Sequence, residues 1–156
     1  MHIRLIVVGE RQSSWVSDAF DGYTQRLPRQ WKFRLDTVAT SHRSKSADPL
    51  AAVEAEGQKI LGKVKAGEQL VVLDEHGTEL SSVELAEELS LWQAAGRDLC
   101  FVIGGPDGVS KSCMERADFR WSLSKLTLPH GLARVLCVEQ LYRAWTVSTA
   151  HPYHRP

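Results

Sequence analysis

Short apolar runs alternate with amphipathic segments along the whole chain, and this alternation constrains the fold more than any other feature. The apolar runs, rich in β-branched and aliphatic residues, occupy 3–9, 33–39, 69–74, 98–105 and 119–124. Between them, apolar residues recur at helical spacing over 13–28, 49–64, 81–96, 110–117 and 132–149. Strands that alternate with helices are typical of βαβ units, whose parallel strands are covered by helices. We therefore expect one α/β domain over 1–156, with a mainly parallel sheet and helices on both faces.

Capping signals mark the predicted helix ends. The expected N-caps are Ser13 or Ser14, Asp48, Ser81 and Ser110. Glu84 lies three residues after Ser81, which is the spacing of a capping box, and Pro49 suits the first position of its helix. Pro28 is expected to end the first helix, and Gly96 the third.

The charge balance limits the classes of partner. Nineteen basic and nineteen acidic side chains give a formal net charge of zero, which argues against indiscriminate binding of nucleic acid or membranes through bulk charge. A local positive surface is still compatible with this balance. The polar loop over 40–49 carries His42, Arg43 and Lys45, and further basic residues lie at 26, 29, 32 and 34. The alternative is that these charges are simply solvated.

Cysteine usage and hydropathy predict a cytoplasmic protein. Three cysteines, Cys100, Cys113 and Cys137, are too few and too far apart for a disulfide framework. Two of them lie in apolar runs, as small buried residues do in a reducing compartment. The N-terminal residues show no secretory signal, and no apolar stretch approaches 18 residues, so we expect no membrane segment.

Several familiar catalytic motifs are missing. The chain has no G-x-G-x-x-G fingerprint for dinucleotides, no P-loop, no G-x-S-x-G and no H-E-x-x-H. His151 and His154 have H-x-x-H spacing, but Pro152 lies between them and no third ligand is evident. We therefore predict no metal site.

Three loops follow predicted strands at the edge where open α/β sheets bind ligands: the loop after Leu73, the segment 104–110 and the segment 123–131. Glycines 104, 105 and 108 would permit positive φ angles and a close approach of the backbone to a ligand. Each segment also has a simpler interpretation, a tight turn for 104–110 and an edge strand for 123–131. The last helix carries apolar residues over more than one stripe, as a core helix does, or a helix that also contacts a partner subunit.

Taken together and in order, three segments resemble one family. "FVIGGPDG" (101–108), "SLSKLTLPHGLARVLCVEQLYRAW" (122–145) and "HPYHR" (151–155) are similar to the RlmH methyltransferases of the SPOUT class. The resemblance implies an α/β fold whose C-terminal part forms a deep trefoil knot, and a homodimer. It also implies methyl transfer from S-adenosylmethionine to N3 of a pseudouridine in 23S rRNA of the assembled 70S ribosome.

The resemblance also assigns site residues. The cofactor-binding candidates are Leu73, Gly104, Gly105, Leu123, Ser124, Lys125, Leu126, Thr127 and Leu128. Lys125 is expected to contribute backbone rather than side-chain contacts. For catalysis the reason is chemical, because N3 of the implied target must lose its proton before it can attack, and the candidates to help are His130, Arg143, Tyr153, His154 and Arg155.

We expect Arg143 and the tail over 151–156 to place the RNA, with His154 as a candidate base. The tail would cover the cofactor pocket, either in its own chain or across the dimer interface.

Two alternatives remain at this stage. A nicotinamide or nucleotide enzyme would bind NAD or ATP rather than S-adenosylmethionine, although the glycine fingerprint is missing. A non-catalytic ribosome-associated factor would bind the particle without transferring methyl groups.

Overall fold

The computed structural model describes residues 1–43, 45 and 48–156, and a five-stranded parallel sheet forms its centre. The strands are β1 (Ile3–Val8), β2 (Arg34–Val38), β3 (Gln69–Glu79), β4 (Leu99–Ile103) and β5 (Phe119–Ser122). Their spatial order is β2-β1-β4-β3-β5, and each neighbouring pair is parallel. The predicted α/β class with a parallel sheet is confirmed.

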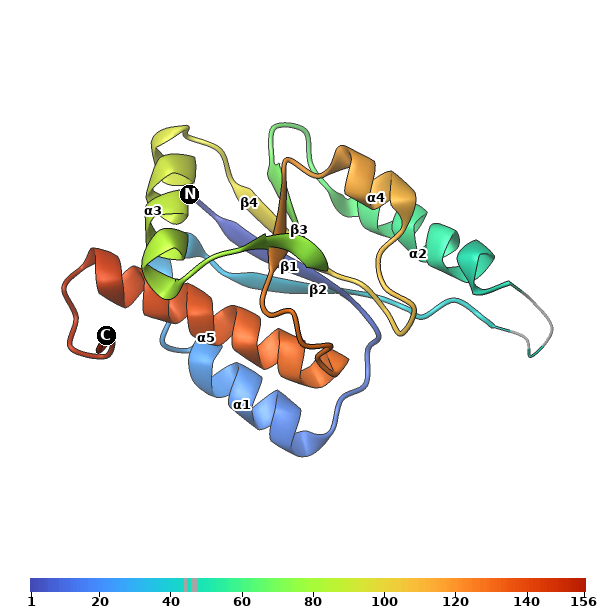
Figure 1. Ribbon diagram of the computed structural model, residues 1–156, viewed down its shortest axis with the longest axis horizontal. Coiled ribbons are helices and arrows are strands. Elements are labelled where there is room, and N and C mark those ends of the chain that lie inside the picture. The colour runs from blue at the N-terminus through green and yellow to red at the C-terminus, as the bar shows by residue number, and fades with distance from the viewer. Residues whose placement is uncertain (44, 46–47) are drawn as a thin grey trace.

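Helices cover both faces of this sheet (Figure 1). They are α1 (Ser14–Thr24), α2 (Pro49–Lys63), α3 (Ser82–Ala94), α4 (Lys111–Arg116) and α5 (His130–Ser148), with a short 3-10 helix at Arg29–Trp31. On one face, α5 packs against both α1 and α3, and on the other face α2 packs against α4. In Figure 1, α5 starts at the edge where the strands end, and the chain's C-terminus lies at the opposite edge.

The two faces of the sheet have separate cores, and β1 contributes to both. Ile3, Leu5 and Val7 belong to the core under α1, α3 and α5. Ile6 and Val8 belong to the core under α2 and α4. Because successive side chains of a strand point to opposite faces, a strand buried on both sides is apolar at almost every position. This explains the apolar run over 3–9, in which Arg4 is the one charged residue.

Most of the predicted caps are present. Asp48 accepts a hydrogen bond from the backbone N of Leu50, Ser81 and Glu84 form a reciprocal capping box, and Ser110 accepts from the backbone N of Cys113. The first helix differs, because Ser13 makes no side-chain cap and α1 ends at Thr24 rather than at Pro28. Helix α5 begins at His130, two residues before the predicted start. Residues 44, 46 and 47 of the predicted loop over 40–49 lie outside the described part of the chain.

Strand β3 is five residues longer than the pattern predicted. Its pairing with β5 breaks after Leu73 and resumes at Thr78, so residues 74–77 leave the ladder. At Gly77 a Cβ would lie 2.6 Å from the carbonyl oxygen of Arg120, which leaves no room for a side chain. This excursion over 74–77 passes close to β5.

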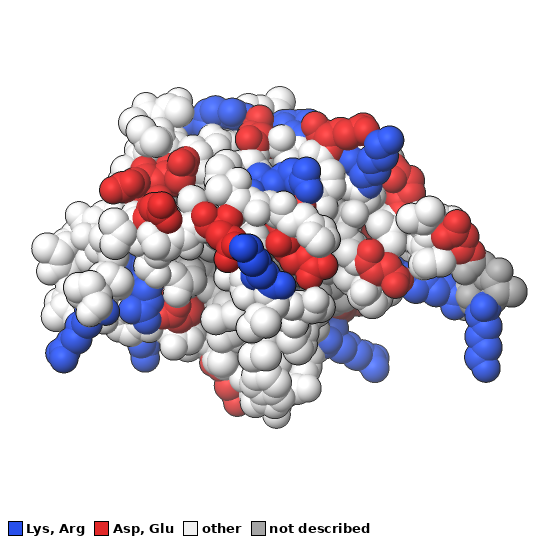
Figure 2. All heavy atoms as spheres, in the orientation of Figure 1, with Lys and Arg blue, Asp and Glu red and all other residues white. Residues whose placement is uncertain are grey.

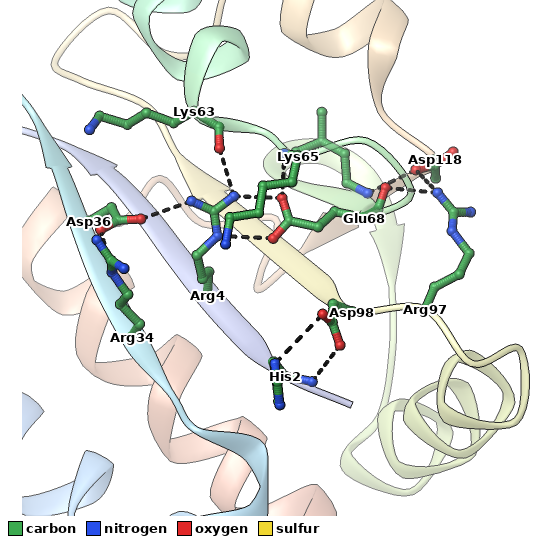
Figure 3. Close-up of polar contacts among 11 residues, drawn as sticks. His2, Arg4, Arg34, Asp36, Lys63, Lys65, Glu68, Arg97, Asp98 and Asp118 are labelled. Carbon is green, nitrogen blue, oxygen red and sulfur yellow. Dashed lines mark hydrogen bonds and ion pairs between the residues drawn. The ribbon is translucent and has the colours of Figure 1, made fainter.

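A buried arginine joins strands at the amino end of the sheet (Figure 3). Arg4 donates from Nε to Glu68 at 2.9 Å, from one terminal nitrogen to Asp36 at 2.9 Å, and from the other to the carbonyl of Lys63 at 2.7 Å. Burial raises the pKa of Asp36, but hydrogen bonds from Arg4 and Arg34 outweigh it, and the net pKa lies below its ordinary value. This network fixes the end of β1 opposite the edge at which the strands end.

Cys100 and Cys137 are buried and unpaired, as predicted, and so is Cys113, which lies outside the apolar runs. Within the described ranges, no helix has both the length and the apolar character needed to cross a bilayer. The trefoil knot implied by the resemblance stays a prediction.

Candidate functional site

A cavity of about 600 Å³ lies at the carboxyl ends of β3 and β4. Its walls come from three segments, 73–76, 103–109 and 123–130, which are the loops that the sequence placed at this edge. The predicted cofactor residues that line it are Leu73, Gly104, Gly105, Leu123, Ser124, Leu126, Thr127 and Leu128. Lys125 does not line the cavity, because its side chain is exposed and lies 3.6 Å from a carboxylate oxygen of Glu79. Cofactor binding by these residues stays a prediction.

The glycine turn over 104–108 needs its glycines for two different reasons. At Gly104 a Cβ would lie 2.5 Å from the carbonyl oxygen of Gly108, and at Gly105 it would lie 2.9 Å from Val8. Only Gly108 has a positive φ, of 85°. The sequence predicted that these glycines permit positive φ and a close approach of the backbone. Gly108 uses the first property, whereas Gly104 and Gly105 are required by close packing within the protein.

The excursion over 74–77 holds the segment 123–128 against β3. Glu75 accepts a hydrogen bond from Thr127 Oγ1 at 3.1 Å, and the backbone carbonyl of Glu75 accepts from Ser122 Oγ at 3.1 Å. Ser124 Oγ accepts from the backbone N of Leu126 at 2.9 Å. These bonds place one wall of the cavity without using strand pairing, which explains why 123–128 is neither helix nor strand.

His130 has both ring nitrogens engaged. Arg134 donates from Nε to His130 Nε2 at 2.9 Å, and His130 Nδ1 lies 2.8 Å from the carbonyl oxygen of Gly104. A guanidinium can only donate, so Nε2 must be the unprotonated nitrogen, and Nδ1 carries the hydrogen that is donated to Gly104. Burial, and then the charge of Arg134, lower the pKa of His130. The imidazole is therefore neutral, and in this arrangement it has no free lone pair to take a proton from a substrate.

Arg134 continues this chain of contacts to β1. It is 4% exposed and donates to the carbonyl oxygen of Gly9, just after the end of β1. Burial lowers the pKa of Arg134. The first turn of α5 thereby joins the carboxyl ends of β1 and β4 at the cavity.

The second half of α5 carries a different cluster. Glu139 accepts hydrogen bonds from Arg143 Nε at 3.0 Å and from the hydroxyl of Tyr153 at 2.9 Å. The guanidinium of Arg143 also lies over the Tyr153 ring, 4.7 Å from its centroid. Burial, and then the neighbouring Tyr23 and Glu139, raise the pKa of Tyr153. This arrangement brings together two of the predicted catalytic residues, Arg143 and Tyr153.

The tail lies away from the cavity of its own chain. At about 1.5 Å per residue, α5 separates His130 from Arg143 by about 20 Å, and Figure 1 places the C-terminus beside the far end of α5. Among the residues that the structure describes, those that line the cavity include none of 151–156. The tail therefore does not cover the pocket of its own chain. That it covers the pocket of a partner chain in a dimer stays a prediction.

His154 has an unusual environment. Its Nδ1 is buried and finds no hydrogen-bond partner in the part of the chain that the structure describes. An unpartnered buried polar atom is costly. His151 packs instead on aromatic side chains, 6.0 Å from Trp145 and 6.4 Å from Tyr142 between ring centroids. Over residues 1–43, 45 and 48–156, no cluster of three His, Cys, Asp or Glu is arranged to hold a metal.

Several of the basic residues that could form a local positive surface instead contact groups of their own chain. Arg43 points inward to Glu56 and Asp107, Arg34 pairs with Asp36, and Arg26 lies over the ring of Tyr23. His42 and Lys45 are exposed. On the face drawn in Figure 2, acidic and basic side chains are interspersed.

Sequence reasoning missed four residues of the site: Glu56, Asp107, Arg134 and Glu139. Glu139 and Arg143 have the i, i+4 spacing of a helical ion pair, a signal that could have identified them. Glu56 lies among the buried residues of α2, and a carboxylate there requires a partner. The contact between Arg134 and His130 also has i, i+4 spacing.

Comparison with known proteins agrees with this architecture. Residues 1–154 match the family described as "Predicted SPOUT methyltransferase". The ribosomal RNA large subunit methyltransferase H of Methylococcus capsulatus is 44% identical over 155 residues, covering 99% of this chain and 100% of the relative. The protein of the same name from Teredinibacter turnerae is 46% identical over 158 residues, with the same coverage.

A solved structure shares the fold. It is described as "a probable methylase family protein from Haemophilus influenzae Rd KW20", with a TM-score of 0.57, 13% identity, and coverage of 99% of this chain and 70% of that chain. At this identity the likeness concerns the fold alone. From the full-length matches it follows that the chain belongs to the SPOUT methyltransferase family, among the ribosomal RNA large subunit methyltransferase H proteins.

Proposed function

We propose that this protein transfers a methyl group from S-adenosylmethionine to N3 of a pseudouridine in 23S rRNA, and that it acts in the cytoplasm on the assembled 70S ribosome. The observation that carries the proposal is the full-length match, above 40% identity, to proteins named for methylation of large-subunit rRNA. The donor, the target atom and the particle rest on the resemblance described above.

The cavity fits such a donor. Its volume is in the range of pockets for small ligands, and it combines leucine side chains with backbone polar groups from a glycine turn. Leu73, Leu123 and Leu128 offer apolar contacts to an adenine ring. Glu75 lines the same cavity and would favour a cationic ligand. S-adenosylmethionine would supply a methyl group bound to a sulfonium. The sulfonium is already cationic and leaves as a neutral thioether, so the transfer needs no metal.

The protein's own task is then alignment, exclusion of water and removal of the N3 proton. His130 is poorly suited to take the proton, because both ring nitrogens are engaged. We assign that step to the tail, with His154 as the candidate base and with Arg143 and Tyr153 placing the RNA. Glu139 would hold Arg143 and Tyr153 in position.

This assignment requires a homodimer, because the tail is remote from the cavity of its own chain. Large exposed apolar side chains support a partner surface: Trp15 on α1, Leu126 beside the cavity, and Leu132 and Leu136 on α5. A second chain that covered this surface could bring its tail to the cavity.

Net neutrality suits an enzyme that recognises a particle. Docking by shape and local contacts needs no strongly basic surface, and indiscriminate RNA binding would compete with it. We therefore expect weak binding to free rRNA and activity on ribosomes. Efficient methylation of a short free hairpin would contradict this expectation.

Two experiments test the proposed function. Calorimetry should show binding of S-adenosylmethionine and no binding of NAD or ATP, and the reverse pattern would overturn the choice of donor. Labelled S-adenosylmethionine incubated with ribosomes that lack the modification should label 23S rRNA. Ribosome binding without methyl transfer would instead indicate a non-catalytic ribosome-associated factor.

A further inference from the structure

Arg43 joins three segments that are distant in the sequence. Its two terminal nitrogens each donate to Glu56 of α2, at 2.9 Å. Its Nε donates to Asp107 Oδ2 at 2.6 Å. A single planar guanidinium in the loop after β2 thus connects α2 to the glycine turn at the cavity. We call Arg43, Glu56 and Asp107 the Arg43 clamp.

Glu56 holds the guanidinium of Arg43 in a fixed position. Its side chain is 2% exposed, and it also accepts a hydrogen bond from the backbone N of Ser41 at 2.8 Å. Burial raises the pKa of Glu56, but the hydrogen bonds from Arg43 and Ser41 outweigh it, and the net pKa lies below its ordinary value. Glu56 is therefore ionised at neutral pH, and Arg43 is committed to it rather than to solvent.

The clamp acts on the turn that closes the cavity. Glu56 lies directly beneath the turn, because a Cβ at Gly105 would be 3.3 Å from its Oε1. Within the turn, the backbone N of Gly108 donates to the carbonyl of Gly105 at 3.1 Å. Asp107 lies between those two glycines and lines the cavity. On the other side, His130 donates to the carbonyl of Gly104, so the turn is held at two points.

We propose that Arg43 is a positioning residue that holds the glycine turn in its ligand-binding conformation, with Glu56 fixing the guanidinium and Asp107 linking it to the turn. A turn that is ordered before the ligand arrives avoids the entropic cost of ordering it on binding. The clamp should therefore strengthen cofactor binding while leaving the methyl-transfer step nearly unchanged. This inference rests on the proposed function, because it takes S-adenosylmethionine to be the ligand of the cavity.

The test measures the dissociation constant of S-adenosylmethionine by calorimetry for the intact protein and four variants. They are Asp107→Asn, Arg43→Met, the double variant, and Glu115→Gln as the control. The control removes a carboxylate from an exposed ion pair with Lys111 on α4, outside the site. Asp107→Asn is the cleaner break, because Asp107 is partly exposed and the buried pair of Arg43 with Glu56 stays intact.

We expect each single variant to bind about tenfold more weakly, a loss typical of a charge-assisted hydrogen bond. The double variant should bind S-adenosylmethionine about as tightly as the single variant with the lower affinity, since both changes break the same link. In steady-state assays, KM for S-adenosylmethionine should rise while kcat at saturation changes less than twofold. Additive losses would mean that Asp107 acts on the ligand directly, and would overturn the proposal.

Other outcomes also decide the question. A fifth variant, Arg43→Lys, should bind S-adenosylmethionine as weakly as Arg43→Met, because an ammonium cannot reproduce the fork that serves two carboxylates. If Arg43→Met fails to fold, Asp107→Asn alone carries the test, and affinity equal to that of Glu115→Gln overturns the inference. Weaker ribosome binding with unchanged cofactor affinity would make Arg43 an RNA contact instead. If the intact protein does not bind S-adenosylmethionine, the proposed function fails first, which separates the two failures.

Discussion

The Nε–H group of Arg134 donates a 2.9 Å hydrogen bond to Nε2 of His130, and a buried cation thereby fixes the tautomer of the imidazole beside the cavity. The other ring nitrogen must then donate to Gly104. This relationship makes His130 a residue that holds the glycine turn rather than a base.

Replacing His130 separates these two roles. Glutamine has an oxygen that can accept from Arg134 and an amide that can donate to Gly104, so His130→Gln should retain most of the affinity for S-adenosylmethionine and much of the methylation rate. His130→Ala loses both bonds and should bind about tenfold more weakly. Calorimetry and a methylation assay on ribosomes make the comparison. Complete loss of catalysis in His130→Gln, with binding intact, would restore the case for a base.

Removing Arg134 should change the titration of His130. The nearby positive charge lowers the pKa of His130 in addition to burial, so Arg134→Met should raise that pKa while burial still keeps it below about 6.5. Because the folded pKa is lower than the unfolded one, the free energy of unfolding falls as the pH falls below about 6.5. This loss should be smaller in Arg134→Met. NMR titration of the His130 ring measures the pKa, and an unchanged value would contradict the account.

The network around Arg4 should matter for stability but not for binding. Arg4→Met leaves Glu68 buried without its cation and should cost about 3–5 kcal/mol in the free energy of unfolding. Urea denaturation measures the loss. Because the network lies at the opposite end of the sheet, the folded variant should bind S-adenosylmethionine as the intact protein does. Weaker binding would show that the two edges are coupled.

The lowered pKa of Asp36 predicts how the free energy of unfolding changes at acidic pH. Its folded pKa lies below the unfolded value, so its contribution to stability is complete above the unfolded pKa of about 3.9 and is lost as the pH falls through the folded pKa. Asp36→Asn should therefore be less stable than the intact protein at pH 7, and the difference should shrink as the pH falls toward 3. Denaturation at several pH values checks this, with a constant difference as the contrary result.

Tail variants test the assignment of catalysis. Removal of residues 151–156 should abolish methylation of ribosomes, while the walls of the cavity, to which no tail residue of the same chain contributes, should still bind S-adenosylmethionine. His154→Ala should reduce methylation by about 10²-fold or more, as loss of a general base does. Tyr153→Phe is the milder control, because it removes only the hydroxyl that donates to Glu139. Unchanged methylation in both His154→Ala and the truncated protein would refute the role of the tail.

Mixed dimers test whether the tail acts on the partner's cavity. Gly104→Ala should prevent binding, since its Cβ would lie 2.5 Å from a backbone oxygen. A chain with Gly104→Ala and an intact tail, mixed with a truncated chain that has an intact cavity, should regain methylation at one site of each dimer. Failure of the mixture, although mixed dimers form, would show that each tail serves its own chain.

The sequence predicted those features that depend on neighbours in the chain or on burial of whole strands. The run over 3–9 identified β1 because both of its faces are buried, and Ser81 with Glu84 identified the start of α3 because capping is local. The extension of β3 was missed because residues 75–79 are polar and are held by β5, which lies about 45 residues further on. Such pairing leaves no periodic pattern.

The site was predicted at the level of segments rather than interactions. The three loops at the cavity follow from strand order, since parallel strands end at the same edge of the sheet. The inward orientation of Arg43 depends on Glu56 and Asp107, which approach it only in the folded chain. From its position in the sequence alone, Arg43 was assigned to a polar, basic loop. The remoteness of the tail from its own cavity is likewise a property of the length of α5.

Mass spectrometry of 23S rRNA gives the most direct test of the central claim, that this protein methylates a pseudouridine of the large ribosomal subunit. Cells that lack the protein should contain 23S rRNA in which one pseudouridine is lighter by one methyl group, and expression of the intact chain, but not of Gly104→Ala, should restore it. If that nucleotide carries its N3 methyl group in cells without the protein, the account is contradicted.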